Sequence, residues 1–164
     1  MNNNVKYIVS PAQQYALEAA IDMNHPLLLT GEPGTGKTEM ANWAVAYLND
    51  KEGGYHPNVQ VFNTKTTSKA SDLFYTYDAL SHFQAANLRG EQAVPPERFI
   101  TLNAFGKAIA YSDPGRSEFA DKFGLILPEK PQHTVVLIDE VDKAPRDFTN
   151  DLLDEIVNYR FSIR

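Results

Sequence analysis

Apolar residues recur at two different spacings along the chain, and their alternation predicts helices separated by short buried strands. Ser10 followed by Pro11 is typical of a helix N-terminus. The aliphatic run Leu27–Thr30 predicts a strand, and the glycines of 31–36 predict a loop directly after it. Residues 37–48 then repeat with the period of a helix, whose inner face would carry Met40, Ala41, Ala44, Val45 and Leu48.

The second half of the chain continues this alternation less regularly. Short apolar runs predict strands at Val59–Phe62 and Thr134–Ile138, and the spacing of apolar residues predicts helices at 73–80 and Phe99–Tyr111. Pro145 predicts the start of a last helix, whose inward face would carry Phe148, Leu152, Leu153 and Ile156. Strands that alternate with helices predict an α/β fold with a mostly parallel sheet.

Composition narrows the class of protein. A chain of 164 residues that is 43% hydrophobic suits one globular domain. It contains no cysteine and its four histidines are scattered, so a metal site built on thiolates or imidazoles is not expected. The net charge of −6 repels nucleic acid and anionic lipid, and no apolar run approaches the length of a membrane span. We therefore expect a soluble cytoplasmic protein without nucleic-acid or membrane partners.

The segment Gly31–Thr38 matches the Walker A pattern of phosphate-binding loops. Its glycines allow successive backbone N–H groups to turn toward a phosphate at the N-terminus of the following helix. Lys37 would reach the β- and γ-phosphates, and the Thr38 hydroxyl would bind Mg²⁺. The residues expected around the nucleotide are Glu32, Pro33, Gly34, Thr35, Gly36, Lys37 and Thr38. The alternative is an ordinary glycine-rich turn with a surface lysine.

An acidic motif follows the predicted strand near the end of the chain. Val135–Glu140 has the form of a Walker B strand. Asp139 would hold Mg²⁺ opposite Thr38, and Glu140 would be the general base that polarises an attacking water. Apolar strands often end in acidic residues, so this pattern indicates a nucleotide site only in combination with the Walker A loop upstream. The glutamate favours hydrolysis of a nucleotide over phosphoryl transfer to a second substrate.

Leu27–Thr38 and Val135–Ile156 together resemble the AAA+ ATPases. Within them the sequence is most similar to the MoxR-like branch, for which the run Asp139–Pro145 followed by an Asn-x-Leu-Leu helix is typical. The resemblance implies a P-loop NTPase fold with three layers, α/β/α, around a mostly parallel sheet. It further implies that Mg-ATP is bound and hydrolysed to remodel partner proteins. The subunits would form a ring in which a neighbour supplies an arginine finger.

The resemblance also implies roles outside the two motifs. Asn63 follows the second predicted strand, where many AAA+ proteins use a polar residue to hold the catalytic Glu140 inactive; a plain turn residue is the alternative. Ile8 and Val9 precede the first helix, where the family packs the adenine; a segment that covers the core is the alternative. The long separation of the two motifs implies an insertion at about 68–98. A client or a partner of the von Willebrand factor A type is a further expectation.

The family's core sheet continues after the last predicted helix with the strand that carries the sensor-1 residue. Phe161–Ile163 resembles only the first half of the hairpin before that strand. Residues 1–164 are therefore expected to be the N-terminal part of an AAA+ domain, incomplete at its C-terminus and poorly active alone; the alternative is that the remaining strands pair differently. Two other functions stay open: a P-loop kinase for a small molecule, and a non-catalytic nucleotide-dependent interaction module.

Overall fold

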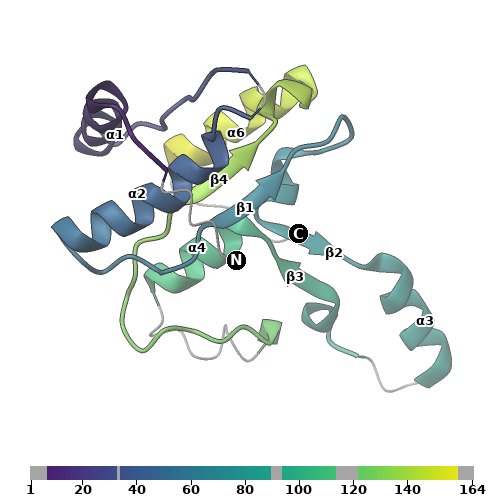
Figure 1. The fold of residues 1–164 in the computed structure, drawn as a ribbon. Coiled ribbons are helices and arrows are strands. Elements are labelled where there is room, and N and C mark those ends of the chain that lie inside the picture. Colours follow the sequence, from purple (N-terminus) through teal and green to yellow (C-terminus); the bar gives the residue numbers. More distant parts are fainter. Residues whose placement is uncertain (1–6, 33, 90–93, 114–121, 159–164) are drawn as a thin grey trace, which may run out of the picture.

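The computed structural model of the chain describes residues 7–32, 34–89, 94–113 and 122–158. Figure 1 shows helices gathered around a short parallel sheet, and a separate hairpin that carries one helix away from that sheet. Within these ranges, no helix is long and apolar enough to cross a bilayer.

Helix α1 (Pro11–Asp22) begins where the sequence predicts. The Ser10 Oγ accepts a hydrogen bond from the Gln13 N–H at 3.3 Å, and the Gln13 Oε1 accepts one from the Ser10 N–H at 2.9 Å. This reciprocal capping box satisfies N–H groups that the first turn of a helix leaves unpaired. Ala20 is the one buried side chain of α1, so apolar burial contributes little to holding this helix in place.

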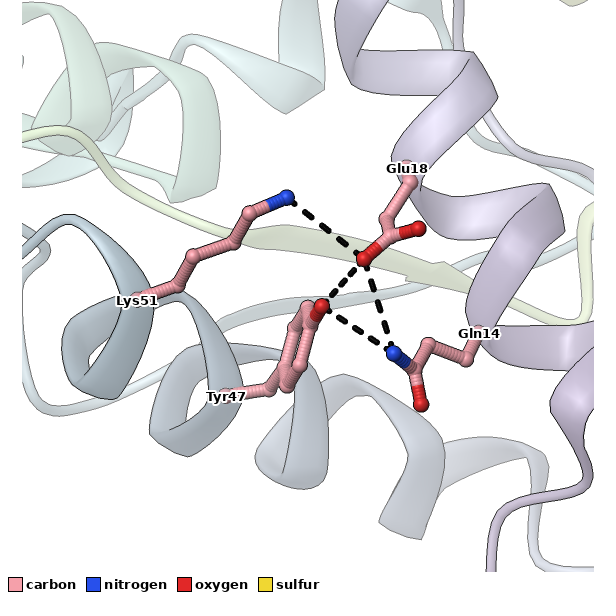
Figure 2. Close-up of polar contacts among 4 residues, drawn as sticks. All are labelled: Gln14, Glu18, Tyr47 and Lys51. Atoms are coloured by element: carbon pink, nitrogen blue, oxygen red, sulfur yellow. Dashed lines mark hydrogen bonds and ion pairs between the residues drawn. The ribbon is translucent and has the colours of Figure 1, made fainter.

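A cluster of polar side chains joins α1 to helix α2 (Lys37–Lys51), as Figure 2 shows. The Tyr47 hydroxyl donates a hydrogen bond to Glu18 Oε1, and Gln14 Nε2 donates one to the Tyr47 hydroxyl at 3.1 Å. Lys51 Nζ lies 3.5 Å from the same Glu18 oxygen. The hydrogen bond from Tyr47 is the main cause that lowers the pKa of Glu18 below its usual value. The cluster is therefore strongest while Glu18 is ionised.

We predict that this cluster makes the attachment of α1 sensitive to acid. The folded-state pKa of Glu18 lies below its ordinary value of 4.5, so the stabilisation is present above that value and is lost as the pH falls through the lower folded-state pKa. At about pH 7, Glu18→Gln should lower the free energy of unfolding, and this difference should shrink as the pH falls below 4.5. Urea unfolding at a series of pH values measures it, with exposed Glu129→Gln as the control. A difference that stays constant with pH would contradict the role given to Glu18.

The inner face of α2 agrees with the prediction from its spacing. Its buried side chains are Met40, Ala41, Ala44, Val45 and Leu48. The helix continues to Lys51, past the predicted end, because no glycine or proline comes before Gly53.

The parallel sheet pairs β1 (Gln60–Asn63) with β4 (Val136–Asp139). Both strands lie within two residues of the predicted runs. Phe62 is paired with Ile138 and Asn63 with Asp139, so the two carboxyl ends lie side by side. Helix α2 contacts β4, which gives the described part the α/β arrangement that the sequence predicts.

The core lies where the sheet meets the last helix. Phe62 and Ile138 pack against a buried cluster that contains Leu73 of the 3-10 helix η1 (Ala70–Leu73). The rings of Phe62 and Phe148 stack with their centroids 6.3 Å apart.

Helix α6 (Arg146–Asn158) supplies Phe148 and Leu152 to this cluster, and both are buried as predicted. The side chains of Leu153 and Ile156 lie outside the described part of the structure.

The predicted strand at Leu27–Thr30 is wrong, because this segment forms no strand in the structure. A strand exists through its pairing, and the described strands pair only as β1 with β4 and as a second, separate pair. Leu28 is accordingly 72% exposed rather than buried. The strand predicted to begin at Phe161–Ile163 lies outside the described residues.

The helices predicted at 73–80 and 99–111 are wrong in part, because an antiparallel pair of strands occupies portions of both ranges. Strand β2 (Tyr75–Tyr77) pairs with β3 (Ile100–Leu102), which follows the 3-10 helix η2 (Pro96–Phe99). Both strands are rich in aromatic and β-branched residues, which favour a strand once a partner is present.

Helix α3 (Ala79–Arg89) comes between these two strands in the sequence, and Figure 1 shows that it projects away from the parallel sheet. Helix α4 (Ala104–Ser112) follows the second strand. Asn103 Nδ2 joins the base of the hairpin by donating to the Asp72 carbonyl oxygen and to Thr76 Oγ1, each at 2.7 Å.

Gly106 lets α4 approach the hairpin closely. A Cβ added there would lie 2.1 Å from the Phe74 carbonyl oxygen and 3.2 Å from Leu102 Cδ2. Because the nearer atom belongs to the backbone, rotation of a side chain cannot relieve the contact.

We therefore predict that Gly106→Ala lowers the free energy of unfolding by about 1–3 kcal/mol or more, the usual cost of overpacking. Urea unfolding measures it. The control is Ser112→Ala, at an exposed position of the same helix, which removes only a local hydrogen bond to the Ile109 carbonyl oxygen and should change stability by about 1 kcal/mol or less. Equal effects of the two substitutions would contradict the close approach.

Candidate functional site

A glycine-rich loop leads into α2. Gly34 and Gly36 have φ values of 83° and 81°, in the left-handed region that favours glycine. Gly36 is the N-cap of α2, so the loop ends where the helix presents its unpaired N–H groups. A Cβ added at Gly34 would meet no atom within 4 Å, so the loop borders open space at this position. Pro33, predicted to contact the nucleotide, lies outside the described residues.

The ammonium group of Lys37 folds back onto this loop. Its Nζ donates hydrogen bonds to the carbonyl oxygens of Gly31 and Glu32, each at 2.9 Å. Thr35 Oγ1 donates to the same Glu32 oxygen at 2.9 Å. The loop thus holds a positive charge at a helix N-terminus, an arrangement suited to an anion such as a phosphate. Thr38 is exposed in the first turn of α2.

The segment before α1 reaches the same loop through Tyr7, which the motifs did not indicate. A Cβ added at Gly36 would lie 2.6 Å from Cε2 of Tyr7, so the ring packs against this glycine. Ile8 is 86% exposed, whereas Tyr7 and Val9 are half-buried. Side chains alternate in direction along extended backbone, and this period of two is the signal that could have found Tyr7.

Two acids stand at the carboxyl end of β4. Glu140 has φ 55° and ψ 40°, a left-handed conformation that costs a non-glycine residue about 1–2 kcal/mol. Its N–H donates to Asp139 Oδ1 at 2.9 Å. Its carboxylate pairs with Lys143 Nζ at 2.6 Å, at the end of the 3-10 helix η3 (Val141–Lys143). The hydrogen bond with the Glu140 carboxylate raises the pKa of Lys143 above its usual value. Strained backbone of this kind is concentrated at functional sites.

Asn63 is the last residue of β1 and lies opposite Asp139 in the ladder. The Thr64 N–H donates a hydrogen bond to the Asp139 carbonyl oxygen at 3.0 Å, so the two strands remain paired up to this position. Asn63 is exposed, and the Glu140 carboxylate pairs with Lys143. The strand pairing thus brings Asn63 beside the two acids, while its restraint of Glu140 stays a prediction.

The loop and the acids come from neighbouring elements. Helix α2 contacts β4, and in Figure 1 the loop before α2 lies toward the end of β4 that leads to Glu140. In the ranges that the structure describes, no group of three or more His, Asp or Glu side chains could hold a metal by itself. Thr38 and Asp139 supply too few ligands for most metals. They suit Mg²⁺, because this ion usually binds one or two protein groups together with water and phosphate oxygens.

We predict that Gly36→Ala destabilises the chain more than Gly34→Ala does. Both substitutions force alanine into the left-handed region, at about 1–2 kcal/mol each, but only the Cβ at position 36 meets the Tyr7 ring. The excess should be about 1 kcal/mol, and it should disappear when Tyr7→Ala is combined with Gly36→Ala. Urea unfolding of the single and double variants measures this coupling. If Gly36→Ala lowered the free energy of unfolding equally in the presence and absence of the Tyr7 ring, the packing of Tyr7 on the loop would be contradicted.

A family model described as AAA domain (dynein-related subfamily) matches residues 26–163. Searches of the curated proteins and of the solved structures give no match. The matched range includes both the glycine-rich loop and the two acids, so these lie in one family domain.

Proposed function

The chain belongs to the AAA domain family, dynein-related subfamily, and from this premise we propose that it binds Mg-ATP at residues 31–38 and hydrolyses it with Glu140. Domains of this family are in general nucleotide-binding ATPases that assemble into rings. The observation that carries the proposal is the position of Lys37. Its ammonium group lies within a glycine-rich loop at the N-terminus of α2, and α2 contacts β4, the strand that ends at Asp139.

The loop supplies the groups that would bind the phosphates. Lys37 would exchange its two neutral carbonyl partners for phosphate oxygens, because hydrogen bonds between charged groups are stronger. Backbone N–H groups at the start of α2 would donate to the same phosphates. Tyr7, Ile8 and Val9 would lie beside the base. The remaining loop residues that we assign to the nucleotide are Glu32, Pro33, Gly34, Thr35 and Gly36.

Thr38 and Asp139 would hold Mg²⁺. When bound, this ion neutralises negative charge on the phosphates and orients them. Asp139 already accepts the Glu140 N–H on one carboxylate oxygen, which leaves the other oxygen for the ion or its water ligands.

Glu140 would accept a proton from the attacking water. Its carboxylate is paired with Lys143 in the structure, and both side chains are about half exposed, so this ion pair costs little to open. Asn63 would act as a positioning residue that holds Glu140 away from the water until a partner binds. A neighbouring subunit would supply an arginine that stabilises the transition state.

The narrower assignment is to the MoxR-like branch. The run Asp139–Pro145 supports it, and β2 and α3 lie within the range of about 68–98 that we assign to the insertion, although their partner strand β3 follows that range. On this assignment ATP hydrolysis would serve to remodel partner proteins, among them proteins of the von Willebrand factor A type.

Phosphate release from Mg-ATP tests the role of Glu140. Glu140→Gln keeps the shape of the side chain but removes its basicity, so the rate should fall by at least about 10²-fold while the affinity for Mg-ATPγS is retained. Glu129→Gln, at an exposed loop position, should leave both unchanged.

The rate should be followed over a series of protein concentrations, because the arginine would come from a second subunit. An unchanged rate in Glu140→Gln would remove this residue from the mechanism. Absence of release from the unaltered chain at every concentration would contradict hydrolysis by this chain.

A further inference from the structure

Strand β1 has one edge that no described strand covers. The N–H groups of Gln60 and Thr64 donate toward the β4 side, each at 3.0 Å. Peptide groups alternate in direction along a strand, so those of Val61 and Asn63 point to the opposite edge. Among the described strands, β1 pairs with β4 alone. The opposite edge therefore offers backbone donors and acceptors to another extended chain.

A cavity of about 280 Å³ runs along this edge. Besides all four residues of β1, it is lined by Lys65, Asn103, Ala104 and Lys107. Consecutive side chains of a strand point to opposite faces of a sheet, so a cavity that touches all four must follow the backbone edge. A second cavity of about 300 Å³ continues past the strand and shares with the first Phe62, Asn63, Lys65 and Asn103.

Two lysines give this edge a positive charge. Lys65 is exposed and Lys107 is half-buried, and neither forms an ion pair with any residue of the described ranges. No acidic residue lines the first cavity. Asp72 lines the second, where its Oδ2 accepts a hydrogen bond from the Lys69 N–H at 2.9 Å. In a chain of net charge −6, this edge is a local reversal of sign that attracts an anionic group.

We propose that the free edge of β1 binds an extended acidic peptide segment of a partner protein by strand addition. The backbone of the partner would pair with the peptide groups of Val61 and Asn63, and its carboxylates would pair with Lys65 and Lys107. Backbone pairing supplies affinity in this mode of recognition, and side-chain contacts supply specificity. The proposal goes beyond the ATPase activity and needs no nucleotide, so the two can fail separately.

A peptide fits this edge better than a nucleic acid does. The strand presents donors and acceptors at the spacing of another polypeptide. Single-stranded nucleic acids bind through aromatic side chains that stack on their bases, and Phe62 is the one aromatic residue that lines either cavity. Phe62 also packs into the core, so its ring is occupied.

The probe for the test is a fluorescein-labelled peptide of alternating glutamate and valine, titrated with the full chain and followed by fluorescence anisotropy without nucleotide. It should bind, and the same peptide N-methylated on the residues that would pair should bind at least about tenfold more weakly, because it lacks the N–H donors. A peptide with lysine in place of glutamate should not bind.

Variants of the chain locate the binding site. The double substitution Lys65→Glu, Lys107→Glu should weaken binding at least about tenfold. The control Lys122→Glu, Lys130→Glu has the same net charge, but its exposed lysines line neither cavity, so it should retain most of the affinity. Val61→Pro removes an N–H of the free edge without removing a bond to β4, and it should also weaken binding. Far-UV circular dichroism checks that each variant folds, and if Val61→Pro does not, the N-methylated peptide tests the same hydrogen bonds.

Three results would overturn the proposal. Equal binding of the N-methylated peptide would exclude strand addition. Equal losses in the two lysine double variants would mean that net charge alone governs binding. Tighter binding of an oligouridylate than of the acidic peptide would assign the edge to nucleic acid.

Discussion

The parallel pairing of β1 with β4 is the constraint on which the candidate site depends. It brings Asn63 opposite Asp139 and so gathers the polar residues that follow both strands. Phe62 and Ile138, one position earlier, anchor the same pair of strands on the cluster that includes Phe148. A rigid core beneath the strand end can support the left-handed conformation of Glu140, which local preferences alone would disfavour. The acids are thus held in place by apolar packing directly behind them.

The elements that the sequence predicted well are those whose residues need little information from elsewhere in the chain. The capping box at Ser10 is local, and the inner face of α2 follows from helical spacing. The loop 31–36 was predictable because its glycines allow a conformation that other residues rarely adopt. The positions of β1 and β4 were nearly right because each is an apolar run.

The predictions that were wrong depend on partners that are distant in sequence. Leu27–Thr30 has the composition of a strand, but it pairs with no described strand. Tyr75–Tyr77 fits a helical spacing as well as a strand, and its pairing with Ile100–Leu102 decides between them. The ion pair of Glu140 and the packing of Tyr7 on Gly36 also arise from the fold, and no motif marks them. Spacing therefore indicated candidate site residues but carried no information on the contacts that these residues make.

Calorimetric titration with Mg-ATPγS and Mg-GTPγS shows whether the loop around Lys37 binds the phosphates of a nucleotide. We expect Mg-ATPγS to bind in preference to Mg-GTPγS. Lys37→Ala should abolish this binding, whereas Lys130→Ala, at an exposed lysine away from the loop, should retain it. Binding that survives Lys37→Ala unchanged, or a chain that binds neither nucleotide, would mean that the loop is not a nucleotide phosphate site.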